Sequence, residues 1–308
     1  MLQTITIAHL TDVHLSPVAG LLPRYWNAKR ALGLANWLRH RERAHDRGVL
    51  HLLERDIARE NPNHIVVTGD LTNLGLPWEH QQALTWLSGL GAEHEVSVIP
   101  GNHDIYTRIG RDEGTVRWRP FMRSDLEGSR FAPPEWGFPY VRLVGRIALV
   151  GLNSAIETPP LIAAGKLGEA QMERLRGVLR GLGAEGLFRL VMIHHPPLPG
   201  QTSASRALKD ARELARLLSE TGAELVIHGH NHIAQTTWLR AADRAIPVVA
   251  GASASLGSPH KHETLARYNL YRISGPPWHV ELQARGLKRQ NGAVEDVGHQ
   301  ILAPAPAA

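Results

Sequence analysis

The stretch HIVVTGDLTN, residues 64–73, contains the pattern that recurs along the chain, an apolar run that ends in polar residues. A short apolar run rich in β-branched residues ends in Gly69 and Asp70, which is typical of a strand buried on both faces. Similar runs ending in polar or small residues recur along the chain. They are TITIAHLTDVH (4–14), VSVIPGNHD (96–104), RIALVGLNS (146–154), RLVMIHHPP (189–197), ELVIHGHNH (224–232) and IPVVAGASAS (246–255).

Helical patterns separate several of these runs. They are HLLERDIARE (51–60), WEHQQALTWLSGL (78–90), EAQMERLRGVLRGL (169–182) and SASRALKDARELARLLSETG (203–222). Strands that alternate with helices indicate an α/β fold. The later segments RYNLYRIS (267–274) and WHVELQARG (278–286) have no helix between them and predict neighbouring antiparallel strands. We therefore expect two packed mixed β-sheets flanked by helices.

The predicted organisation is one catalytic domain over residues 1–285, followed by a C-terminal extension at 286–308. Two stretches interrupt the strand–helix pattern. Residues 16–48 form a basic insertion rich in Trp, and residues 105–140 form a cap-like insertion. Both follow polar strand ends, so both are expected over the same edge of the sheets.

The amino-acid composition limits the kinds of active site and the cellular locations that the protein can have. The 308 residues contain no cysteine, which excludes disulfides, a catalytic thiol and thiolate metal ligands. The formal net charge of +5 suits an anionic substrate. The first residues lack a signal-peptide pattern, and no apolar run reaches the ~18 residues of a membrane span. We expect a cytoplasmic protein, with contact at the inner face of the membrane as a second interpretation.

Ligands of open α/β sheets bind beyond the carboxyl ends of the strands. The runs bring metal-type side chains to that edge: Asp12, His14, Asp70, Asn102, His194, His230 and His232. Seven ligands are too many for a single ion with an open position, but they suit two ions that share a carboxylate. Mixed imidazole, carboxylate and amide ligation suits two divalent or trivalent ions of Mn, Fe, Zn or Co.

The motifs DVH, GD, GNHD, H and GHNH occur in this order between residues 5 and 235, and here the sequence resembles the calcineurin-like metallophosphoesterases. The resemblance implies a first metal on Asp12, His14 and His232, with Asp70 as the bridge. It implies a second metal on Asn102, His194 and His230. It also implies that His103 is catalytic and that Asp104 orients it.

Four further polar residues lie beside these motifs. His195 follows His194 directly and so points away from it; we interpret it as a residue that supports the metal ligands or forms a wall of the substrate pocket, with a plain structural role as the alternative. Asn73 and Asn153 are either substrate contacts or turn residues. His228 ends its strand, and we expect it to support the site without binding metal.

The basic insertion has a core, residues 20–47, that contains seven Arg or Lys residues against Glu42 and Asp46, together with several Trp and Leu residues. The pattern predicts a basic amphipathic helical segment. Three interpretations are open: a lid helix with a solvated Arg side, a surface that contacts anionic lipid, or a contact in a homo-oligomer.

The predicted function is hydrolysis of a small phosphodiester by a metal-bridging hydroxide, with His103 assisting the leaving group. The first alternative is a nucleotide-lipid pyrophosphatase of the UDP-diacylglucosamine type, working at the membrane surface. A phosphomonoesterase or nuclease of the same superfamily is another. Nucleic acid is a poor partner, because the basic residues are not interleaved with a stacking platform outside the insertion. A non-enzymatic binding module is disfavoured because every motif is complete.

Overall fold

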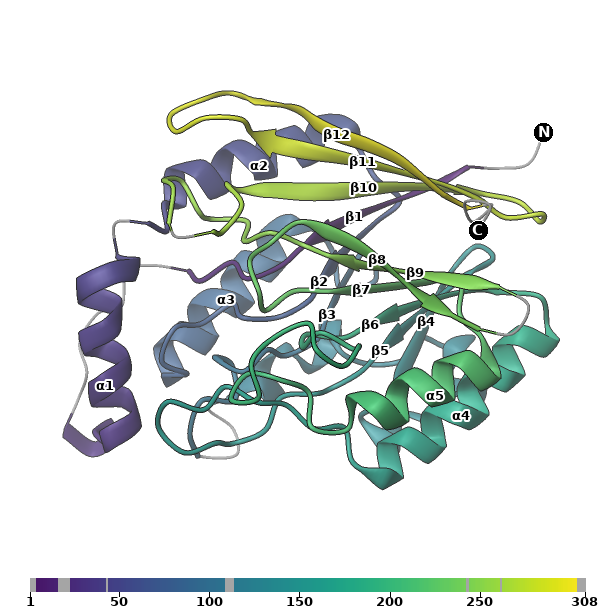
Figure 1. Ribbon diagram of the computed structural model, residues 1–308, viewed down its shortest axis with the longest axis horizontal. Helices are drawn as coiled ribbons and strands as arrows, with labels where there is room; N and C mark the ends of the chain where they lie inside the picture. Colours follow the sequence, from purple (N-terminus) through teal and green to yellow (C-terminus); the bar gives the residue numbers. More distant parts are fainter. Residues whose placement is uncertain are drawn as a thin grey trace.

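The computed structural model describes residues 4–15, 23–42, 44–108, 114–241, 244–260 and 262–303. Two six-stranded mixed sheets face one another, and helices cover their outer sides (Figure 1). This architecture confirms the predicted fold class.

The first sheet has the order β12-β11-β10-β1-β2-β3. Its strands are β1 (Ile5–Leu10), β2 (His64–Val67), β3 (Val96–Val98), β10 (Arg267–Ser274), β11 (His279–Leu287) and β12 (Val294–Ala303). β1, β2 and β3 pair in parallel, and β10 to β12 continue the sheet antiparallel, as predicted for residues 267–286.

The second sheet has the order β4-β5-β6-β7-β9-β8. Its strands are β4 (Tyr140–Val144), β5 (Ile147–Gly151), β6 (Phe188–Met192), β7 (Leu225–His228), β8 (Gln235–Arg240) and β9 (Ala245–Ala250). β5, β6, β7 and β9 are parallel, and both edge strands are antiparallel. The carboxyl ends of all the parallel strands therefore deliver their loops to one rim of the molecule.

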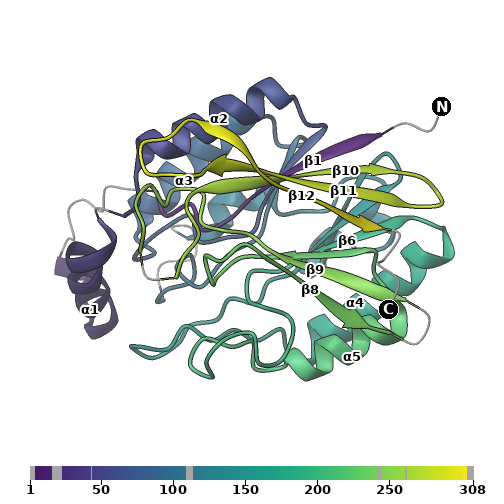
Figure 2. The same ribbon diagram turned by 45° about the horizontal axis from the view of Figure 1, so that its top comes forward.

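The helices are α1 (Ala28–Asn36), α2 (Arg47–Glu60), α3 (Pro77–Leu90), α4 (Glu169–Ala184) and α5 (Ala211–Thr221). α2 and α3 lie beside the first sheet, α4 and α5 lie together beside the second, and α1 projects at one end (Figures 1 and 2). One apolar cluster fills the space between the sheets, and another lies under α4 and α5. Among the helices that the structure describes, none is both long and apolar enough to cross a membrane.

The predicted helix over 203–222 is correct only from residue 211 onward. The preceding residues form a loop of turns, with the amide of Ala163 donating to the carbonyl of Ser205 and the amide of Gly165 donating to the carbonyl of Ala207. The Asp210 carboxylate accepts from the amides of Leu167 and Gly168. These contacts outweigh local helix propensity, and they bring the loop toward the rim.

Much of the described part of the basic insertion is helical, and two of its cations are buried. Lys29 donates to the backbone and hydroxyl of Thr158, and the guanidinium of Arg30 donates to the carbonyl oxygens of Leu74 and Gly75. These bonds attach α1 to the loops at the rim. Residues 16–22 and 43 of the insertion lie outside the described residues.

The other two predicted segments pack against the sheets. In the stretch predicted as a cap, Trp118 is buried and donates to the carbonyl of His80, while the Arg142 guanidinium holds the carbonyl oxygen of Arg123. Residues 115–130 therefore lie along β3 and β4, and residues 109–113 are outside the described part. In the predicted C-terminal extension, β12 pairs with β11 as an edge strand, and residues 304–308 are not described.

Candidate metal centre

Strained backbone is concentrated where the metal ligands were predicted. Of the eight non-glycine residues with positive φ in the described part of the chain, five are predicted ligands: Asp12, His14, Asp70, His230 and His232. Positive φ is unfavourable for such residues and persists only where the surroundings impose it. The strained backbone at these five positions therefore lowers the stability of the fold while it holds the five side chains at the rim.

Close backbone packing holds these turns in place. The Asp12 amide donates to the carbonyl of Gly69 at 3.0 Å, and the His230 amide donates to the Asp12 carboxylate at 2.9 Å. A Cβ on Gly229 would collide with the side chains of Thr11 and Asp12. A glycine is therefore required at 229 because the chain passes so close to the Asp12 carboxylate.

The residues predicted for the first metal converge. His232 Nε2 lies 3.2 Å from Asp12 Oδ1 and 3.3 Å from His14 Nε2, and His14 Nε2 lies 3.9 Å from Asp70 Oδ2. The far nitrogens contact protein oxygens, with His14 Nδ1 at 3.2 Å from the carbonyl of Thr72 and His232 Nδ1 at 3.1 Å from Glu263. Acceptors at Nδ1 turn both Nε2 lone pairs inward, as in metal sites.

The residues predicted for the second metal form a matching group on the other side of Asp70. His194 Nε2 lies 3.4 Å from Asp70 Oδ2, 3.1 Å from Asn102 Oδ1 and 3.3 Å from His230 Nδ1. The Nδ1 atom of His194 lies 2.7 Å from the carbonyl of Thr68. The structure therefore brings all seven predicted ligands together, with Asp70 between the two groups.

The electrostatics favour added cations. Burial would raise the pKa of Asp70, but the imidazoles of His194 and His103 outweigh it and hold the pKa well below its usual value. Burial would lower the pKa of His194 and of His232, but Asp70 and Asp12 respectively raise each to about 9. Asp12 Oδ1 is buried without a hydrogen bond. Two carboxylates, an amide oxygen and four imidazoles in this arrangement fit a pair of transition-metal ions.

His103 lies at the centre of the rim. Its Nδ1 lies 2.6 Å from the carbonyl oxygen of Asn73, its amide donates to Asp70 Oδ1, and its ring stacks on Tyr106. The predicted orienting role of Asp104 takes a different form. The Asp104 carboxylate accepts from the amides of Asp70, Leu71, Thr72 and Gly101, and so fixes the loop that carries Asp70.

The remaining candidates, His195, Asn73 and His228, are all buried. Both ring nitrogens of His195 have protein partners, the Ser154 hydroxyl and the Ala163 carbonyl, and its ring packs 4.6 Å from that of His230. Asn73 is buried beneath His103. His228 belongs to none of the donor groups found among the described residues, and its Nδ1 lies 3.0 Å from the carbonyl oxygen of Gly229.

Asn153 has the geometry of a turn residue. Its side-chain oxygen accepts from the amide of Ala155 two residues on, and its own amide donates to Gln171. This corresponds to the second of the two interpretations that the sequence left open.

A cavity of about 210 Å³ opens onto this cluster. Its walls include Asp70, Asn102 and His103 together with four residues that the sequence did not single out: Asn36, Arg206, His260 and Glu263. Arg206 donates to the carbonyl of His230 at 2.7 Å and brings a guanidinium to the cavity from the 201–210 loop. The only signal for Arg206 was its position shortly after the His194 motif.

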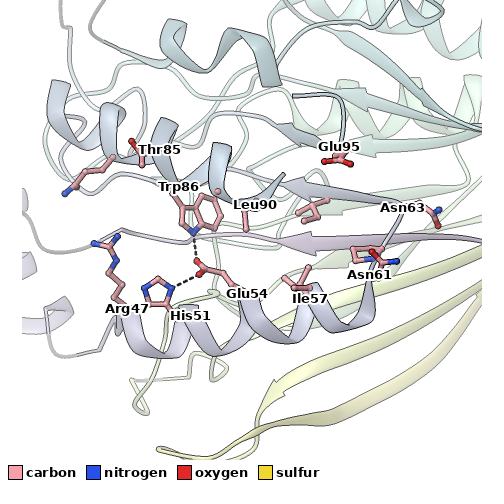
Figure 3. A pocket seen from close by; sticks show the side chains of 15 residues that line it. Arg47, His51, Glu54, Ile57, Asn61, Asn63, Thr85, Trp86, Leu90 and Glu95 are labelled. Carbon is pink, nitrogen blue, oxygen red and sulfur yellow. Dashed lines mark hydrogen bonds and ion pairs between the residues drawn. The ribbon is translucent and has the colours of Figure 1, made fainter. Parts of the chain in front are cut away.

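A larger cavity of about 530 Å³ lies between α2 and α3 (Figure 3). Its Glu54 carboxylate is paired with the Trp86 indole and the His51 imidazole. No donor group that can hold a metal lies there in the described part of the chain. The smaller cavity is therefore the candidate site.

Comparison with known proteins agrees with this geometry. Residues 5–234 match the family model described as calcineurin-like phosphoesterase. The chain is 26% identical over 244 residues to a probable cyclic nucleotide phosphodiesterase of Synechococcus sp., covering 75% of this chain and 74% of that protein. It is 27% identical over 222 residues to the glycerophosphodiester phosphodiesterase GpdQ of Enterobacter lignolyticus, covering 71% of each.

Among solved structures, a dimetal phosphatase from Danio rerio has the same fold, with a TM-score of 0.61 and 15% identity over 96% of this chain and 99% of that one. The match of the family model spans well over half of the chain and includes every predicted ligand. The protein belongs to the calcineurin-like phosphoesterases and is a phosphoric ester hydrolase.

Proposed function

We propose that this protein hydrolyses a small phosphodiester at a two-metal centre, with Asp12, His14 and His232 holding one ion and Asn102, His194 and His230 the other. Asp70 is the bridge. The observation that carries the proposal is the convergence of these seven donors on backbone turns that are strained at five of the seven positions. When bound, such a metal pair supplies Lewis acidity and activates a water molecule.

The protein's own residues then have distinct tasks. A proton at Nδ1 of His103 donates to the Asn73 carbonyl, so the opposite nitrogen is aimed away from that carbonyl while the imidazole lines the cavity. When the imidazole is protonated at both nitrogens, its Nε2–H is placed to pass a proton to the leaving oxygen and so to leave the imidazole neutral. Arg206 and His260 add cationic or hydrogen-bonding groups at the mouth, which suits an anionic ester.

Size and relatives support a small diester. The cavity of about 210 Å³ has room for a phosphoryl group with a compact substituent. The two relatives named above are described as phosphodiesterases of cyclic nucleotides and of glycerophosphodiesters. We transfer from them the diester class alone.

The test combines metal analysis with a substrate panel. The purified protein is loaded separately with Mn, Fe, Zn or Co and assayed on bis(p-nitrophenyl) phosphate, a cyclic nucleotide, a glycerophosphodiester and p-nitrophenyl phosphate. We expect two ions per chain and turnover of diesters above that of the monoester. Preference for the monoester, or no turnover by the two-metal form on the whole panel, contradicts the proposal.

One observation favours the second candidate, a nucleotide-lipid pyrophosphatase at a membrane surface. Trp26, Leu32 and Leu38 of the insertion are each at least half exposed, and Asn36 between them lines the cavity. If this is the function, vesicles of anionic lipid bind the protein, and replacing all three apolar residues with Ser releases it. Unchanged diester turnover without detergent, together with no vesicle binding, favours the first candidate.

A further inference from the structure

A buried histidine from outside the five motifs reaches the metal-ligand cluster. His45 lies near the end of the basic insertion and is only 4% exposed. Its backbone forms an isolated antiparallel bridge with Leu256. The Asp46 amide donates to the carbonyl of Ser255, and the Gly257 amide donates to the carbonyl of Ala44, both at 2.8 Å.

The bridge depends on the small residues that follow β9. A Cβ on Gly257 would lie 3.0 Å from Val49 and 3.1 Å from the Cβ of Asp46, closer than side chains normally approach. Gly257 therefore leaves room for the segment that carries His45 to pass beside it. The segment after β9 carries no predicted metal ligand, and its role is to pair with the segment that carries His45.

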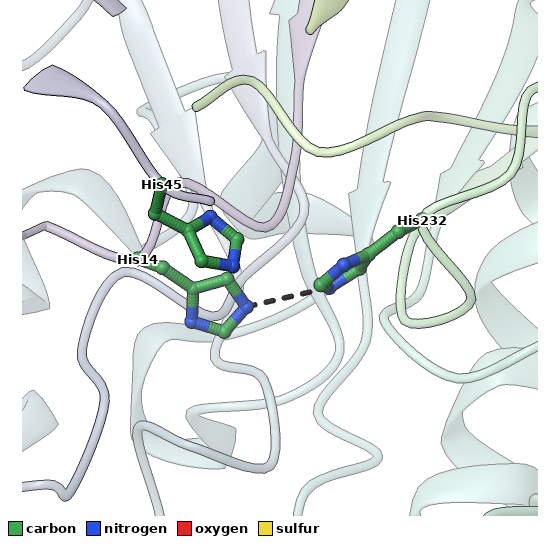
Figure 4. Close-up of side chains that lie close together, drawn as sticks. All are labelled: His14, His45 and His232. Carbon is green, nitrogen blue, oxygen red and sulfur yellow. Dashed lines mark hydrogen bonds between the residues drawn. The ribbon is translucent and has the colours of Figure 1, made fainter. Parts of the chain in front are cut away.

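The bridge points the imidazole of His45 at the first metal group (Figure 4). Its ring lies 4.8 Å from the ring of His14 and 5.9 Å from that of His232, measured between ring centres. One nitrogen of each of the three imidazoles lies within 4.8 Å of the others. His45 thus meets the distance requirement for a shared ion as His14 and His232 do.

The second ring nitrogen repeats the pattern of the predicted ligands. His45 Nδ1 lies 2.7 Å from the Ser255 hydroxyl, as Nδ1 of His14 faces the Thr72 carbonyl and Nδ1 of His232 faces Glu263. In each case a protein oxygen engages Nδ1 and directs Nε2 toward the other imidazoles. A histidine that served only to fill the core would not need its Nε2 directed there.

His45 does not line the cavity that opens onto the cluster, whereas His103 does. A role in substrate binding or proton transfer therefore does not fit its position. We propose that His45 is an additional ligand of the first metal ion, an inference that rests on the proposed two-metal function. The first position then has three imidazoles, His14, His45 and His232, whereas the second has two, His194 and His230. Nitrogen-rich ligation favours Co, Zn or Fe over Mn at the first position.

Cobalt reports this ligand directly, because the visible absorption of Co²⁺ grows stronger as its coordination number falls. The full-length protein is depleted of metal and titrated with CoCl₂, and spectra and bound cobalt are recorded for the unmodified chain and His45→Ala. We expect the variant to absorb more strongly per cobalt and its first-site affinity to fall by more than about 100-fold, beyond the range of lost supporting contacts. Added imidazole should restore the unmodified spectrum.

His64→Gln is the matched control, since it removes a buried histidine whose partner is Ser97 on β3. Its cobalt spectrum should equal that of the unmodified protein, and circular dichroism should show all three chains folded. A His45→Ala spectrum identical to the unmodified one, or an affinity loss without a spectral change, overturns the ligand role. If the unmodified chain itself binds only one cobalt, the proposed function fails instead.

Discussion

Histidines are buried in two different settings in this fold, and the comparison shows what makes a metal site. At the rim, His194 and His232 contact the carboxylates of Asp70 and Asp12, which raise each pKa to about 9 against the effect of burial. Inside the first sheet, His9 and His64 hydrogen-bond to the hydroxyl groups of Thr68 and Ser97, and burial lowers each pKa to about 3. Burial of an imidazole is common to both regions. A carboxylate partner marks His194 and His232, whereas His230 is a predicted ligand whose pKa is held well below its usual value by burial and by the neighbouring imidazoles of His195 and His194.

The largest effect should follow from removing the central carboxylate. Asp70→Asn keeps the shape of the side chain but removes the charge between the two ligand groups. We expect loss of at least one metal ion per chain and a fall in turnover of about 10³-fold or more, since preorganised charge alone is worth this much. Metal content by mass spectrometry and a diesterase assay check the result.

Asp56→Asn is the control for Asp70→Asn, because Asp56 is a buried carboxylate that pairs with Arg285 and Tyr268 and belongs to none of the donor groups found among the described residues. This variant should lose stability and keep its metals. If Asp70→Asn still binds two metal ions and keeps full activity, the rim is not the active site.

The next effect concerns a rim histidine that is not a predicted ligand. His103→Gln should retain both metals and lower turnover by roughly 10²–10⁴, the usual span for a lost proton donor. The loss should be smaller for a substrate whose leaving group is a good one, such as p-nitrophenolate. Equal losses on substrates with good and poor leaving groups would exclude proton donation by His103.

A third prediction concerns Asp104, which holds the loop that carries Asp70 and is not itself a predicted metal ligand. Asp104→Asn replaces an oxygen that accepts backbone amides with an NH₂ group that opposes them. Burial and the neighbouring Asp70 carboxylate raise the pKa of Asp104 to about 7 despite these amides, so the comparison is made at pH 8, where the carboxylate is mostly ionised. Hydrogen bonds to charged groups are worth about 1.5–3 kcal/mol each, and we expect the free energy of unfolding to fall by about 2–4 kcal/mol. Asp125→Asn, whose carboxylate accepts the two amides of Gly128 and Leu143, should lose less. Urea unfolding measures both, and equal losses would contradict the special role of Asp104.

The parts of the site that were predictable from sequence are those that follow from strand ends. Asp12, Asp70 and His194 come directly after apolar runs, and parallel strands bring such positions together whatever the loops do. His45, Arg206 and Glu263 reach the same rim from long connections. Their positions depend on contacts between loops, such as the bridge to Leu256, which leave no periodic signal in the sequence.

Two edge strands of the sheets were likewise not predicted from the sequence. β8 and β12 alternate with exposed polar residues and contain no long apolar run, so the pattern used for buried strands missed them. β12 forms because it pairs with β11 along its length, a contact with a neighbour in the sheet. Hydrophobic periodicity reports burial, and an edge strand is only partly buried.

The smallest effect tests the interior histidines, through pH. Burial, assisted by Arg142, lowers the pKa of His64 from 6.5 to about 3 in the folded chain. Below pH 6.5 the unfolded chain therefore binds a proton at this residue that the folded chain does not, and stability falls as the pH drops from about 6.5 toward 3. Between pH 7 and pH 5 this amounts to about 2 kcal/mol.

His64→Gln should remove that contribution, so the variant, somewhat less stable at pH 7 for want of the original contact with Ser97, should approach the unmodified protein at pH 5. His299→Gln removes an exposed histidine of β12 and should leave the pH dependence unchanged. Both comparisons use chemical unfolding at several pH values in metal-loaded protein, which keeps the rim constant. If the free energy of unfolding of His64→Gln and of the unmodified protein changes equally between pH 7 and pH 5, burial of the His64 imidazole does not lower its pKa as stated. The contrast between the rim histidines and the interior histidines is then wrong for the interior ones.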